Sequence, residues 1–98
     1  MLRRVQILGK DILSAFQRKH AAAEKPLSAW RAFVERADWK TTADVKRDFV
    51  TASFLSRNRI VFNIGGNKFR LLVTAVFCKG RVLVEKIGTH AEYDRWKL

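Results

Sequence analysis

The C-terminal stretch of the sequence concentrates side chains that can move protons. His90 and Tyr93 stand three residues apart, and Asp94 follows directly. An imidazole changes charge near neutral pH, and a phenol can donate a proton or stack on a base. Thr89 followed by Glu92 has the spacing of a capping box, so the pattern predicts a short helix on which His90 and Asp94 are neighbours. The same pattern is also typical of a capped terminal helix without catalytic function.

A second group of candidate residues is cationic and is expected on β-strands. In an expected strand over residues 68–77, the two-residue period places Lys68 and Arg70 on one face and an apolar row on the other. That apolar row is Phe69, Leu71, Val73 and Ala75. Arg59 on the preceding strand and Lys86 on the following one extend the cationic face, which favours phosphate binding. Lysines and arginines that solubilise the wet face of a sheet give an equally good account of the pattern.

The N-terminal half predicts one strand and two helices. Residues 2–8 alternate apolar and polar side chains, and residues 10–23 show helical spacing. Pro26 suits the first turn of a second helix, in which Trp30, Phe33, Val34 and Ala37 form a stripe expected to be buried. A short helix over 44–49, capped by Thr41 or Thr42, is expected to lead into an irregular connection.

The C-terminal half predicts a strand meander over residues 59–64, 68–77 and 81–87. Its turns fall at Gly65-Gly66-Asn67 and at Lys79-Gly80, where residues that tolerate positive φ are found. The expected fold is therefore α+β, with the N-terminal strand and two helices packed on one face of an antiparallel sheet. A chain of 98 residues is expected to form a single domain, residues 1–98.

Charge and composition narrow the class of protein. The formal net charge of +11 points to a polyanion such as nucleic acid as the partner. No apolar run reaches the roughly 20 residues of a membrane helix, and no secretory signal is evident, so a cytoplasmic location is expected. The one cysteine, Cys78, is expected to be a buried or inert thiol, and the spacing of His20 and His90 suggests no metal. We expect no cofactor.

Two sequence blocks resemble the HigB-type toxins of bacterial type II toxin-antitoxin systems, within the RelE superfamily. The blocks are Val61-Phe-Asn-Ile-Gly-Gly-Asn-Lys-Phe-Arg-Leu72 and Ile87-Gly-Thr-His-Ala-Glu-Tyr-Asp94. A weaker central pattern comprises Trp39, Asp44, Val45, Lys46, Phe54 and Leu55. The resemblance implies a small α+β toxin that cleaves mRNA, generally on the translating ribosome, and is neutralised by a cognate HigA-type antitoxin.

Cleavage of RNA sets its own chemical requirements. The 2′-hydroxyl attacks the adjacent phosphate, so an enzyme must orient the sugar, remove a proton, neutralise the phosphorane and protonate the leaving 5′-oxygen. This chemistry needs no metal. We assign the phosphate clamp to Arg70 with support from Lys68, and proton transfer to His90 and Tyr93 without deciding which is acid and which is base. The expected RNA-binding residues are Arg59, Asn63, Asn67, Lys86 and Lys97.

Two other functions remain open at this stage. A toxin of the same fold could inhibit a different target such as gyrase, as relatives are known to do. A non-enzymatic RNA-binding module would instead use basic strands and aromatic stacking platforms. Most Phe residues fall on expected core faces, which argues against the stacking module. For Gly65, Gly66 and Asn67, a backbone role in the turn is favoured over a phosphate cradle.

Overall fold

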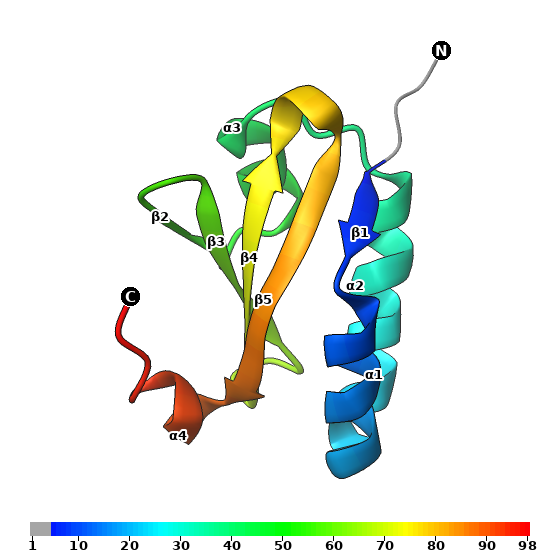
Figure 1. Cartoon of the computed structure of the whole chain (residues 1–98), viewed down its shortest axis with the longest axis vertical. Helices are drawn as coiled ribbons and strands as arrows, with labels where there is room; N and C mark the ends of the chain where they lie inside the picture. The colour runs from blue at the N-terminus through cyan, green and yellow to red at the C-terminus, as the bar shows by residue number, and fades with distance from the viewer. Residues whose placement is uncertain (1–4) are drawn as a thin grey trace.

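The computed structural model describes residues 5–98 and has helices on one side of a five-stranded sheet. Figure 1 shows α1 and α2 side by side against the sheet, with α4 at the far end of β5. The helices are α1 (Lys10–Lys19), α2 (Glu24–Arg36), α3 (Thr42–Asp48) and α4 (His90–Tyr93). The strands are β1 (Gln6–Leu8), β2 (Ser53–Leu55), β3 (Arg59–Ile64), β4 (Phe69–Val76) and β5 (Arg81–Thr89). This confirms the α+β prediction.

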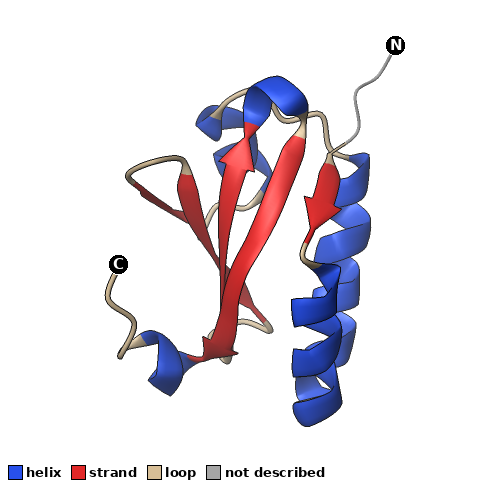
Figure 2. Cartoon of the chain, viewed as in Figure 1, coloured by secondary structure: helices blue, strands red, loops and turns tan. Residues whose placement is uncertain are grey.

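The sheet has the order β1-β5-β4-β3-β2 (Figure 2). All neighbours pair antiparallel except β1, which runs parallel to β5. β1 confirms the C-terminal part of the strand expected over residues 2–8, and residues 1–4 lie outside the described part of the chain. The expected antiparallel sheet is thus correct for four strands, and the β1–β5 pair adds a parallel edge.

One face of the sheet forms the core with the helices. Phe69, Leu71, Val73 and Ala75 are all buried there, as the two-residue period predicts. They pack with buried helical residues that include Leu13, Leu27, Trp30, Val34 and Val45. The opposite face, from which Arg70 projects, carries none of these helices, and we call it the open face.

The helical predictions need two corrections. The first helix ends at Lys19, and residues Ala21–Ala23 form a 3₁₀ turn, because His20 leaves the helical conformation with φ −128° and ψ 90°. In α2, which begins at Glu24, Trp30 and Val34 are buried as expected, but Phe33 is 47% exposed. Consecutive helical residues point about 100° apart, so Phe33 lies at the rim of the stripe that Val34 centres.

The segment between α2 and the meander contains an unexpected strand. The capped helix is confirmed: the Thr41 side chain accepts a hydrogen bond from the Asp44 backbone, and Asp44 accepts one from the Thr41 backbone. However, the expected irregular connection includes β2, which pairs with β3. With three residues and no alternating burial, β2 carries no periodic signal in the sequence.

The turns of the meander are confirmed, with shifted strand ends. Gly65, Gly66 and Gly80 all adopt positive φ, which glycine tolerates without steric cost. Lys68 lies in the first turn and not in β4, and β5 extends to Thr89. Cys78, in a 3₁₀ turn over Phe77–Lys79, is exposed, so of the two expected alternatives the buried thiol is wrong, and the inert thiol stays a prediction. Over residues 5–98 no helix is both long and apolar enough to span a membrane.

Candidate active site

Arg70 is the centre of the site. It lies on β4 opposite Asn63 of β3 and Gly88 of β5. Its side chain is only 8% exposed, and among residues 5–98 it is the one buried charged side chain. Removing an ion from water is costly unless its hydrogen bonds and charge are satisfied. The contacts of Arg70 therefore decide what the site can bind.

The guanidinium of Arg70 has hydrogen-bond acceptors but no counter-ion. Its Nη1 donates to the backbone oxygens of Asn67 and Phe69, at 3.3 and 3.2 Å, and its Nη2 donates to the Asn67 side-chain oxygen at 3.0 Å. The ring of Tyr93 lies 5.6 Å from the guanidinium carbon, within the range of a cation-π contact. Within the described part of the chain, no carboxylate forms an ion pair with Arg70. Its positive charge has no negative partner among the described residues.

A capping box fixes the C-terminal helix next to Arg70, as the sequence predicts. The Thr89 side chain accepts from the Glu92 backbone, and the Thr89 backbone N–H donates to the Glu92 carboxylate at 2.8 Å. That backbone hydrogen bond is the main reason why the pKa of Glu92 lies below its usual value. The cap starts α4 directly after β5, which places Tyr93 over Arg70.

His90 is anchored at the same end of the sheet. Its backbone N–H donates to the backbone oxygen of Lys68 at 3.0 Å, which ties the start of α4 to the β3–β4 turn. The imidazole is half-exposed, and its Nδ1 lies 3.3 Å from an Asp94 carboxylate oxygen. Arg70 and His90 therefore belong to one corner of the molecule. Lys68 itself is an exposed residue of that turn.

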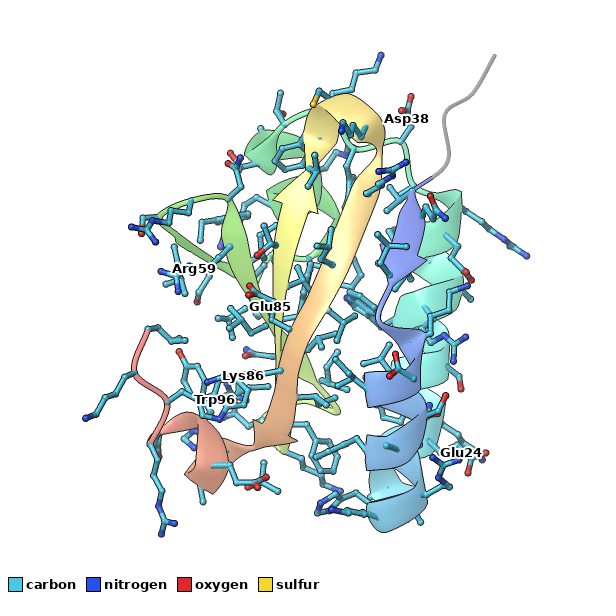
Figure 3. The ribbon with its side chains drawn as sticks, viewed as in Figure 1. Glu24, Asp38, Arg59, Glu85, Lys86 and Trp96 are labelled. Atoms are coloured by element: carbon cyan, nitrogen blue, oxygen red, sulfur yellow. The ribbon has the colours of Figure 1, made fainter. Side chains whose placement is uncertain are left out.

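A β-bulge brings two consecutive residues of β5 to the open face. Leu72 pairs with Lys86 while Val73 pairs with Val84, so Glu85 is the extra residue of the ladder. Glu85 accepts a hydrogen bond from Thr74. Figure 3 shows Lys86 next to Trp96, with Glu85 further along the strand. The bulge escaped the sequence analysis because a strict two-residue period leaves no place for an extra residue.

Trp96 is a site residue that the sequence analysis did not identify. The Lys86 ammonium lies 5.7 Å from the centre of its ring, and Tyr93 packs against its edge at 5.5 Å. A methyl group on Gly88 would lie 3.0 Å from Trp96. The glycine in the Ile87–Asp94 block was the available signal, because a glycine in a strand often marks the close approach of another group.

The remaining predicted RNA-binding residues lie at different distances from Arg70. Asn63 is directly opposite and half-buried. Arg59 is opposite Thr74, four residues along β4 from Arg70 or about 14 Å at the usual strand rise. Its guanidinium binds the backbone oxygens of Ser56 and Leu98. Lys97 is exposed beyond α4. Asn63, Asn67 and Tyr93 therefore lie around Arg70, the backbone of His90 is held at the same end of the sheet, and Arg59 lies outside this cluster.

No cluster of three or more potential metal ligands occurs in residues 5–98.

A family model described as HigB_toxin, the RelE-like toxic component of a toxin-antitoxin system, matches residues 23–96. The chain belongs to the HigB toxin family. The match includes Arg70, both of the HigB-like blocks, and all of the site residues discussed above except Lys97.

A curated HigB relative covers nearly the whole chain. The protein named mRNA interferase HigB from Escherichia coli O6:H1 is 27% identical over 93 residues, which are 93% of this chain and 90% of the relative. HigB-family membership makes this chain a toxin with a cognate antitoxin. It also confirms the family suggested by the two sequence blocks.

Proposed function

We propose that this HigB-family chain is a cytoplasmic endoribonuclease that cleaves mRNA while the mRNA is being translated on the ribosome. A HigA-type antitoxin neutralises this activity. The observation that carries the proposal is the buried, unpaired charge of Arg70 beside Tyr93. A scissile phosphate is the missing counter-ion in this proposal. The name of the E. coli relative, mRNA interferase, supports the same activity.

The proposed role of Arg70 is to bind the phosphorane that forms during cleavage. The 2′-hydroxyl attack adds negative charge to the nonbridging oxygens, and a rigid guanidinium stabilises that charge without reorganising. Lys68, two residues before Arg70 in the exposed turn, adds a second positive charge in the proposed mechanism. Because the nucleophile belongs to the RNA itself, this reaction requires no metal-bound hydroxide.

Proton transfer falls to His90 and Tyr93 in the proposed mechanism. The half-exposed imidazole can reach a bound nucleotide and exchange protons with water. Asp94, near Nδ1, favours the tautomer that carries its proton on Nδ1 and leaves Nε2 free to act on the substrate. Tyr93 holds the Arg70 guanidinium from one side, which leaves its hydroxyl to contact the sugar or the leaving group.

The proposal is tested by cleavage of a reporter mRNA in a reconstituted translation reaction. Wild-type protein should produce cuts within the coding sequence, and Arg70→Ala should reduce the rate by about 10²- to 10³-fold, as for loss of one transition-state donor. Arg81→Ala is the matched control, since it removes an exposed cation of β5 away from the site. Thermal unfolding checks that the Arg70 variant is folded.

Three outcomes would reject the assignment. Cleavage by folded Arg70→Ala at the wild-type rate would remove the phosphate clamp. Translation arrest with intact mRNA would favour an RNA-binding module, and altered DNA supercoiling would favour a gyrase-directed toxin.

A further inference from the structure

Both terminal nitrogens of the Arg70 guanidinium are held by one residue. Asn67 accepts from Nη1 through its backbone oxygen and from Nη2 through its side-chain oxygen, at 3.3 and 3.0 Å. The Phe69 backbone oxygen adds a third acceptor on Nη1. Asn67 thus occupies the Nη1/Nη2 edge of the guanidinium.

The backbone of the turn does not require asparagine at position 67. Positive φ values occur at Gly65 and Gly66, which bend the chain, whereas Asn67 is outside the positive-φ region. Many residue types can adopt the backbone conformation at this position. The favoured turn role therefore accounts for the two glycines but leaves the amide side chain of Asn67 unexplained.

The contacts with Asn67 leave one edge of the guanidinium free. Arginine has five N–H donors, and the hydrogen bonds of Arg70 use those of Nη1 and one of Nη2. Nε and the second hydrogen of Nη2 have no acceptor within the described part of the chain. These two donors point the same way, which is the geometry of bidentate phosphate binding.

We infer that Asn67 is a positioning residue: its neutral amide orients Arg70 so that the free Nε/Nη2 edge receives the scissile phosphate, without cancelling the positive charge. An aspartate would make a similar hydrogen bond, but its negative charge would neutralise Arg70 and repel the phosphate. The inference rests on the proposed nuclease function. It assigns Asn67 a contact with Arg70 in place of the direct RNA contact expected from the sequence.

The deciding experiment compares Asn67→Asp and Asn67→Ala by the rate of reporter mRNA cleavage at saturating and subsaturating concentrations of the translated mRNA. Asn67→Asp should retain the wild-type unfolding temperature but lose about 10²-fold in kcat, and Asn67→Ala should lose about tenfold. Asn58→Asp is the matched control because it makes the same charge change in the exposed β2–β3 turn. It should cleave at the wild-type rate.

The two variants separate positioning from a merely structural role. If Asn67 only holds the turn, Asn67→Asp will keep the hydrogen bond and cleave normally, which would overturn the inference. A loss confined to KM, with kcat unchanged, would restore the direct RNA contact and also overturn it. If Arg70→Ala itself cleaves normally, the nuclease proposal fails; if only Asn67→Asp is normal, this inference alone fails.

Discussion

Gly88 lies directly opposite Arg70 in the β4–β5 ladder, and the space above its Cα is filled by the ring of Trp96. The indole in turn contacts Tyr93, whose own ring lies over the guanidinium of Arg70. The absence of a side chain at Gly88 therefore sets the position of two aromatic rings. Of the two rings, Tyr93 is the one to which the proposed mechanism assigns proton transfer.

Substitution Gly88→Ala should displace Trp96. The new methyl group would lie 3.0 Å from the indole and 3.1 Å from the Glu92 Cβ, so the C-terminal segment must move. Overpacking of this kind typically costs about 1–3 kcal/mol of stability. Denaturant unfolding should show this loss, and mRNA cleavage should slow as Tyr93 shifts. The double variant Gly88→Ala/Trp96→Phe should recover part of the lost stability and part of the lost cleavage rate. If the stability losses of the two single variants simply add in the double variant, the contact between Gly88 and Trp96 would be contradicted.

Substitution His90→Ala should leave the fold intact and slow cleavage by about 10²- to 10⁴-fold, the usual contribution of an acid-base group. The half-exposed imidazole contributes little packing. The comparison is Asp94→Asn, which weakens an exposed pair with His90 and should reduce the cleavage rate far less than His90→Ala. A folded His90→Ala protein with the wild-type cleavage rate would exclude proton transfer by this residue.

The Glu92 carboxylate should make stability depend on pH on the acid side. Its pKa is lowered in the folded protein, mainly by the Thr89 backbone N–H, below its ordinary value of 4.5. The stabilisation is present above that value and is lost as the pH falls through the folded pKa. Glu92→Gln, which keeps the capping geometry, should flatten this part of the stability profile measured by urea unfolding. An unchanged profile in Glu92→Gln would contradict this contribution.

Substitution Thr41→Ala should destabilise the protein by about 0.5–2 kcal/mol, because the hydroxyl accepts from the Asp44 backbone and caps α3. Thr42→Ala is the neighbouring control: Thr42 is exposed inside the helix and caps nothing. Thermal unfolding of the two variants measures the difference. Equal melting temperatures would show that the cap contributes nothing in solution.

The sequence predicted the parts of the fold that arise from local chemistry. Alternation along Phe69–Ala75 identifies the core face, and the two glycines after Ile64 identify the turn. The Thr89/Glu92 capping box and the threonine cap expected at Thr41 or Thr42 mark their helices. Phe33 was misplaced because its exposure depends on how α2 is rotated against the sheet, which periodicity specifies only to within a residue.

The candidate site was predicted only in part, because only some of its residues can be recognised from local sequence. Arg70, His90 and Tyr93 came from residue type and family resemblance, and the structure brings them to one corner. Trp96 and the engagement of Asn67 with Arg70 depend on the path of the chain after β5 and through the turn. Such contacts between separate segments leave no periodic trace, so they required coordinates.

The bulge in β5 has a consequence for how this family can vary in length. Glu85 is the surplus residue, so a chain lacking it would continue from Val84 to Lys86 in ordinary alternation. Lys86 and Gly88 would still lie on the face of the sheet that carries Arg70, and Ile87 would still lie on the core face. A single-residue deletion between Val84 and Lys86 should therefore keep the two faces of β5, whereas the same deletion between Lys86 and Gly88 should exchange the two faces at the end of the strand that lies beside Arg70.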